Sequence, residues 1–174
     1  MKSQNLYLGA STLALSLYES AGRFMSHRGL KLRIKPSESL SRHFWTPAMG
    51  QDLSSLIEYG VFPFSNGNAE SLVWRRFSPF ISCVNGLGRA YERRAQESGR
   101  GKRYGGFLTA QTEALANYRT AKGHGFRVYH DPAEGIHHVH IELLPAVGQK
   151  ILKGERSELR IALAQQLFSQ RTPG

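Results

Sequence analysis

One stretch, GFRVYHDPAEGIHHVHIELLP at 125–145, constrains the fold more than any other part of the chain. Apolar and polar residues alternate on both sides of a short segment, Asp131 to Gly135, that is rich in turn-forming residues. Alternation with a period of two is typical of strands that bury one face, and proline and glycine between two such runs favour a turn. The stretch therefore predicts a β-hairpin.

If Pro132 to Gly135 form its loop, the hairpin has a defined register. That register predicts three cross-strand pairs: Asp131 with Ile136, Tyr129 with His138, and Arg127 with His140. One face is then apolar, because successive side chains on a strand point to opposite faces. The other face carries five polar side chains, which are the candidate catalytic residues: His138, His140, Glu142, Arg127 and Tyr129.

These five side chains are suited to cleaving a phosphodiester. One imidazole or Glu142 can remove a proton from the attacking hydroxyl, and the second imidazole can protonate the leaving oxygen. Arg127 can neutralise charge that develops on the phosphate. This interpretation needs no cofactor.

A second interpretation makes the same strand a metal site. His138, His140 and Glu142 share one face and supply nitrogen and oxygen ligands for a single divalent metal ion. A third interpretation gives the strand no chemistry, because alternating polar residues are also typical of the solvated face of an antiparallel sheet. The sequence leaves all three open.

The segment His138-Val139-His140 resembles the His-hydrophobic-His motif of HUH-type single-strand nucleases. The resemblance covers about five residues and implies a metal-dependent cleavage in which a tyrosine on a helix attacks the phosphate. No tyrosine follows Tyr129 in this chain. The resemblance therefore implies that an earlier one serves: Tyr18, Tyr91 or Tyr118.

Charge is the most informative bulk property of the chain. Lysine and arginine number 23 against 13 acidic residues, which gives a net charge of +10 and a pI of about 10.1. Such a chain attracts polyanions, so RNA or single-stranded DNA is the expected partner. The candidate nucleic-acid-binding residues lie in an alternating segment at 30–35, on an expected helix after Pro79, and in an expected flexible basic loop at 99–106: Lys31, Arg33, Lys35, Arg89, Arg93, Arg100, Lys102 and Arg103.

The single cysteine, Cys83, excludes an intramolecular disulfide and a cysteine-rich zinc site. The N-terminal apolar stretch is interrupted by polar residues and by Glu19, which is not typical of a secretory signal or a transmembrane span. We therefore expect a cytoplasmic protein without a membrane partner, and one that could belong to a protein complex.

The expected fold is α+β, with a mostly antiparallel sheet that ends in a C-terminal β-hairpin and is packed by two to four helices. We expect residues 1–174 to form a single basic domain. Patterning predicts helices at 11–27, 52–59, 80–98, 109–120 and 154–169, strands at 5–8, 30–35 and 70–77, an irregular segment at 36–47 and a frayed tail at 171–174.

Together these features favour a small nuclease that binds RNA or single-stranded DNA. One alternative is a non-enzymatic nucleic-acid-binding subunit of a ribonucleoprotein or of a phage- or plasmid-encoded assembly. Another is an inhibitor that presents its positive surface to an acidic protein. Basic charge alone does not separate the two alternatives.

Overall fold

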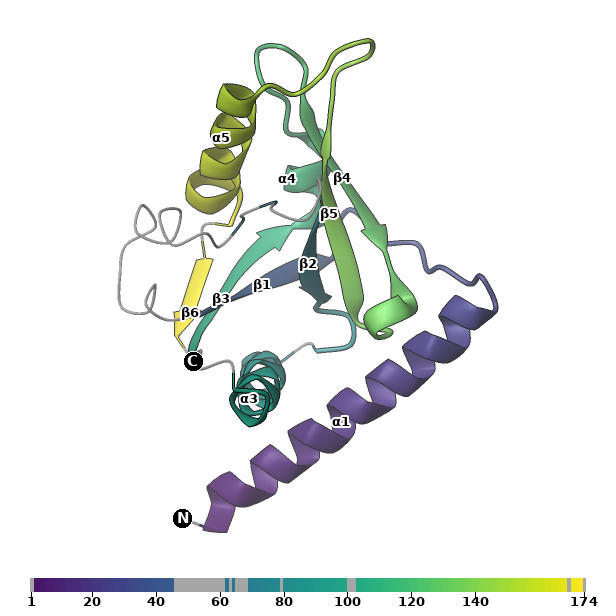
Figure 1. Cartoon of the computed structure of the whole chain (residues 1–174), viewed down its shortest axis with the longest axis vertical. Helices are drawn as coiled ribbons and strands as arrows, with labels where there is room; N and C mark the ends of the chain where they lie inside the picture. The colour runs from purple at the N-terminus through teal and green to yellow at the C-terminus, as the bar shows by residue number, and fades with distance from the viewer. Residues whose placement is uncertain are drawn as a thin grey trace.

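The computed structural model describes residues 2–45, 62, 64, 69–78, 80–99, 103–168 and 170–173 of the chain. Within these ranges the architecture is α+β, as the sequence predicts (Figure 1). The helices are α1 (Lys2–His27), α3 (Ile81–Glu97), α4 (Thr112–Asn117) and α5 (Lys153–Ala162), with a π-helical turn at Leu163–Leu167 and a 3₁₀ turn, η1, at Pro132–Glu134.

A six-stranded antiparallel sheet forms the centre of the fold. Its strands are β1 (Ser39–Trp45), β2 (Ala69–Trp74), β3 (Tyr104–Gln111), β4 (Gly125–His130), β5 (His138–Leu144) and β6 (Gln170–Pro173). They lie in the order β4-β5-β2-β1-β3-β6, so β4 is an edge strand. The edge position leaves one side of β4 without a strand partner.

The two faces of the sheet are packed differently. One face forms the main hydrophobic core, in which α4 and α5 cover the sheet with apolar side chains such as Leu115 and Leu159. On the other face, Val73 of β2 packs with Leu15 of α1 and Leu87 of α3 in a small second cluster. In Figure 1, α1 and α3 accordingly lie on the far side of the sheet from α5. The second face therefore has room for polar side chains.

Several elements differ from the sequence-based expectation. Residues 30–35 keep the predicted burial pattern, with Leu32 and Ile34 half-buried between exposed cations, but they form no strand. Residues 5–8, predicted as a strand, are part of α1, and β1 replaces most of the irregular segment expected at 36–47. Local patterning does not reveal either element. Residues 5–8 are helical because they continue into the amphipathic run that follows them in α1, and β1 is defined by its pairing with β2 and β3.

The C-terminal half holds the other differences. Residues predicted as the start of a helix at 109–120 belong to β3, and only Thr112–Asn117 is helical. The tail expected to fray forms β6, which pairs with β3. The last residues of the expected basic loop, 104–106, are also in β3, while Arg100 and Lys102 lie outside the described residues, as does the helix expected at 52–59. Residues 109–111 are extended because β3 pairs with β1, and the tail is extended because β6 pairs with β3. No local pattern encodes such long-range pairing.

In the described part of the chain, every helix is too short or too polar to span a membrane.

Candidate functional site

The predicted hairpin is present, formed by β4 and β5, but its register differs by two residues from the expected one. Tyr129 pairs with His140 and Arg127 pairs with Glu142, because η1 lengthens the loop between the strands. A shift of two residues preserves the faces of both strands. The five polar side chains therefore share a face as expected, although their partners differ.

Three side chains of this hairpin converge on one point: Asp131, His138 and His140. Each offers a ligand atom, and these atoms all lie within 4.8 Å of one another. The rings of His138 and His140 are 5.0 Å apart and nearly perpendicular. We call these three residues the hairpin cluster.

Other polar groups surround the hairpin cluster. Nδ1 of His140 lies 3.4 Å from an Asp131 carboxylate oxygen and 3.2 Å from the Tyr129 hydroxyl. Nε2 of His138 lies 3.1 Å from a carboxylate oxygen of Glu134 in η1. These contacts fix the orientation of both imidazoles.

Burial and hydrogen bonding set the protonation of His140 and of the neighbouring Glu134. Burial, followed by the proximity of His138, lowers the pKa of His140, so its imidazole is neutral at pH 7 and can accept a proton or bind a metal ion. The hydrogen bond from His138 lowers the pKa of Glu134, which keeps that carboxylate charged. A neutral imidazole of the cluster thus lies near the anionic oxygen of a neighbouring carboxylate.

Glu142 has a different partner from the one that the metal interpretation requires. Its carboxylate is held by Arg127 in a short ion pair, and Nε of Arg127 is 3.0 Å from the same oxygen. The Arg127 guanidinium also lies over the Tyr129 ring, 5.4 Å from its centroid. Asp131, rather than Glu142, is therefore the carboxylate that lies with the two histidines.

Asp131 falls in the segment expected to form the turn, and Glu134 is not among the candidate residues. One signal for Asp131 was present, since it continues the alternation of Arg127 and Tyr129 and so falls on the same face. Glu134 had no comparable signal, because its position depends on η1.

A cavity of about 200 Å³ opens beside the cluster, and its lining includes His138, Glu134, His43 and Tyr91. His138, which is 5% exposed, is the cluster residue that lines this cavity. The buried Nδ1 of His138 has no hydrogen-bond partner among the described residues. A buried nitrogen without a partner is costly unless a ligand satisfies it.

The three tyrosines that the HUH resemblance implies occupy different places. Tyr91 lines the cavity and its hydroxyl lies 3.0 Å from Nε2 of His137. The hydroxyl of Tyr18 donates to the carbonyl of Phe77. Tyr118 packs against Phe126 in the main core. Of the three, Tyr91 is thus the one that the structure places on the cavity of His138.

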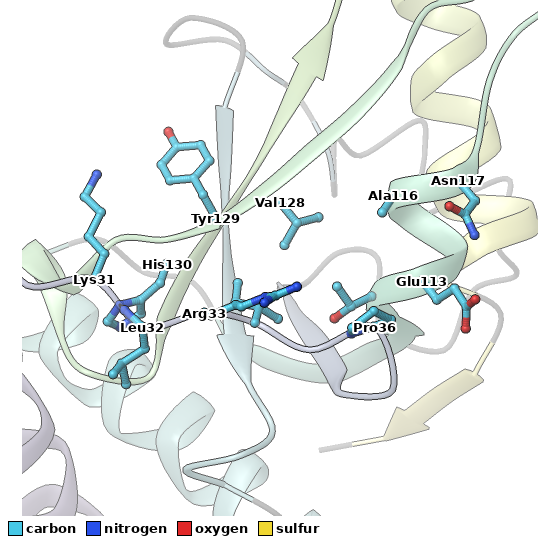
Figure 2. A pocket seen from close by; sticks show the side chains of 12 residues that line it. Lys31, Leu32, Arg33, Pro36, Glu113, Ala116, Asn117, Val128, Tyr129 and His130 are labelled. Atoms are coloured by element: carbon cyan, nitrogen blue, oxygen red, sulfur yellow. Dashed lines mark hydrogen bonds between the residues drawn. The ribbon is translucent and has the colours of Figure 1, made fainter.

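The predicted cationic residues are spread over the molecule. Lys31 and Arg33 border a second cavity of about 430 Å³ next to β4, shown in Figure 2, and Nζ of Lys31 lies 5.7 Å from the centroid of the Tyr129 ring. Lys35 is exposed, as are the remaining predicted cations that the structure describes: Arg89, Arg93 and Arg103. Of these predicted cations, Lys31 is therefore the one with a described contact to Tyr129, whose hydroxyl in turn contacts His140 of the hairpin cluster.

The donor set of the hairpin cluster fits a divalent metal ion. Two imidazoles and one carboxylate are ligands that first-row transition metals such as Mn²⁺ and Zn²⁺ accept, and Nδ1 of His138 is a buried ring nitrogen without a hydrogen-bond partner among the described residues. Comparison with known proteins adds no functional information: no family model, curated protein or solved structure matches the chain.

Proposed function

We propose that this protein is a small metal-dependent nuclease that acts on RNA or single-stranded DNA at the hairpin cluster. The observation that carries the proposal is the convergence of Asp131, His138 and His140 within 4.8 Å, beside a cavity, in a chain of net charge +10. Phosphodiesters are polyanions, and hydrolysing them at neutral pH requires an activated nucleophile and neutralised phosphate charge.

A divalent ion held by the cluster would lower the pKa of a bound water and stabilise charge on a phosphate oxygen. The chain's own groups then have distinct tasks. Glu134 orients His138, and the Tyr129 hydroxyl and Asp131 orient His140. Lys31, beside the Tyr129 ring, attracts the substrate backbone toward the cluster.

The attacking group is either water or a tyrosine. In hydrolysis, the water oxygen bonds to phosphorus, the bond to the leaving oxygen breaks, and that oxygen takes up a proton. In the second route, which rests on the HUH resemblance, the phenolic oxygen of Tyr91 takes the place of water and remains bonded to the phosphate. The place of Tyr91 on the cavity with His138 favours it over Tyr18 and Tyr118.

The test uses end-labelled single-stranded DNA and RNA incubated with the purified protein, with Mn²⁺ or Mg²⁺ and with EDTA. We expect cleavage with metal, none with EDTA, and none by the double variant His138→Ala, His140→Ala. His27→Ala is the matched control, since His27 is exposed at the end of α1. A denaturing gel shows whether a covalent adduct forms and whether Tyr91→Phe removes it.

Other outcomes select the alternatives. Cleavage that persists in EDTA supports the metal-free acid–base interpretation. Binding without cleavage, unchanged in the double variant, supports a non-enzymatic nucleic-acid-binding subunit. Failure to bind either nucleic acid at low salt contradicts the proposal and leaves an inhibitor of an acidic protein.

A further inference from the structure

The larger cavity beside β4 has a polarity that suits one nucleotide of a bound strand. It has a volume of about 430 Å³, which falls in the range of small-ligand pockets. Lys31 and Tyr129 lie toward one end of it and Glu113 and Asn117 toward the other, with Arg33 between them (Figure 2).

The walls between these ends are apolar. Leu32, Ile34 and Pro36 line the cavity from the segment after α1, Val128 from β4 and Ala116 from α4. Flat apolar surface beside an arginine is a suitable site for an unpaired base, which can pack against the wall and stack on the guanidinium plane. Among the described residues, Arg33 makes no salt bridge, and it is exposed. Its guanidinium is therefore free to meet a ligand.

The charges at the two ends indicate how a nucleotide would lie. Phosphate belongs at the end with Lys31, because the Glu113 carboxylate at the opposite end repels it. Carboxylate and amide groups hydrogen-bond to the edges of bases, so the base belongs at the end with Glu113 and Asn117. The side chains of both are exposed there.

Tyr129 connects this cavity with the hairpin cluster. It lines the cavity, its ring lies near Nζ of Lys31, and its hydroxyl lies 3.2 Å from Nδ1 of His140. A bound nucleic-acid strand with one phosphate at the cluster would therefore place its neighbouring nucleotide beside Lys31, at the edge of the sheet formed by β4. We infer that the cavity lined by Arg33, Val128 and Ala116 is a subsite for an unpaired nucleobase close to the phosphate that is cleaved.

This inference rests on the proposed function for its substrate, but it is tested by binding alone. Two strands of about 12 nucleotides are compared, one of single-stranded DNA and one in which every base is replaced by an abasic analogue. Affinity is measured in EDTA by fluorescence anisotropy. Ala116→Trp fills the cavity, and Ala114→Trp adds the same ring at an exposed position of α4 that does not line it.

We expect Ala116→Trp to weaken binding of the base-containing strand at least about fivefold, the lower end of the effect of one stacked base. Binding of the abasic strand should not change, and Ala114→Trp should behave as the unmodified protein with both strands. Thermal unfolding and Mn²⁺ binding by calorimetry confirm that Ala116→Trp is folded with its cluster intact.

The inference is overturned if Ala116→Trp binds both oligonucleotides as tightly as the unmodified protein does. It is also overturned if the substitution weakens binding of both equally, because that result would mean that the cavity contacts the phosphate backbone and not a base. Its failure is separable from that of the nuclease proposal. Cleavage with metal but no base-dependent effect removes the subsite alone. A base-dependent effect without cleavage under any condition removes the nuclease and keeps the subsite.

Discussion

Nδ1 of His130 accepts a hydrogen bond from the backbone N–H of Leu32 at 3.0 Å. Its other ring nitrogen lies 3.0 Å from the carbonyl oxygen of Ile136, to which it must donate. Both bonds together require the neutral imidazole, and burial lowers the pKa of His130 in agreement with this. One histidine therefore attaches the cationic segment at 30–35 to the hairpin that carries the cluster.

His130→Phe should detach this segment while keeping the ring volume and the contact with Trp74. We expect the free energy of unfolding to fall by about 1–3 kcal/mol, because the half-buried backbone groups of Leu32 and Ile136 lose their partner. Hydrogen exchange should show faster exchange of the Leu32 amide. The same substitution at exposed His27 should change neither quantity, and an unchanged Leu32 amide in His130→Phe would contradict the role of the bond.

The stability of the protein should fall in mild acid. Burial lowers the pKa of His43 to about 3 and that of His137 to about 4. Both values lie below that of an unfolded histidine, so the unfolded chain binds more protons below about pH 6.5. The stabilisation is complete above that pH and is lost as the pH falls, by on the order of 2 kcal/mol per histidine at pH 5.

Urea unfolding at pH 7.5 and pH 5 measures this loss. His43→Gln should reduce the difference between the two pH values, while His27→Gln should leave it unchanged, because His27 is exposed. Equal stability at the two pH values would mean that the buried histidines are charged in the folded protein.

Substitutions of two carboxylates test which residues of the hairpin bind the metal ion. Asp131→Asn should reduce the affinity for Mn²⁺ by on the order of 10–100-fold or more, since it removes an anionic ligand. Glu142→Gln should have a much smaller effect, because that carboxylate is paired with Arg127. Isothermal titration calorimetry compares the two. A larger loss in Glu142→Gln would restore the ligand set that the sequence predicted.

Gly22 should be essential for the position of the hairpin loop. A Cβ at Gly22 would lie 2.4 Å from the carbonyl oxygen of Pro132 and 2.5 Å from Cα of Gly135, so α1 and the loop cannot both keep their places. We expect Gly22→Ala to destabilise the protein by about 1–3 kcal/mol, as overpacking does, and to weaken Mn²⁺ binding by displacing Asp131 and Glu134.

Gly154→Ala is the matched control. Gly154 lies in α5, and a Cβ there would meet nothing within 4 Å. Alanine should therefore raise the free energy of unfolding by up to about 1 kcal/mol through its higher helix propensity, and raise the melting temperature with it. If Gly22→Ala were as stable as Gly154→Ala, the close contact between α1 and η1 would not exist in solution.

The elements that sequence patterning located correctly are those whose burial depends on their own periodicity. The amphipathic part of α1 and the helices α3 and α5 repeat apolar residues at helical spacing, and β4 and β5 alternate on either side of a turn. Strands β1, β3 and β6 were missed, because each is defined by a partner distant in sequence.

The sequence by itself determined the α+β class, the hairpin, its polar face with His138 and His140, and the positive charge, because strand periodicity and composition are local properties. Tertiary structure decided which groups meet. The 3₁₀ turn η1 moved the register by two residues, which paired Glu142 with Arg127 and placed Asp131 beside the histidines. Packing of α1 against that turn, at Gly22, then held the loop in place, and no local pattern encodes a contact of this kind.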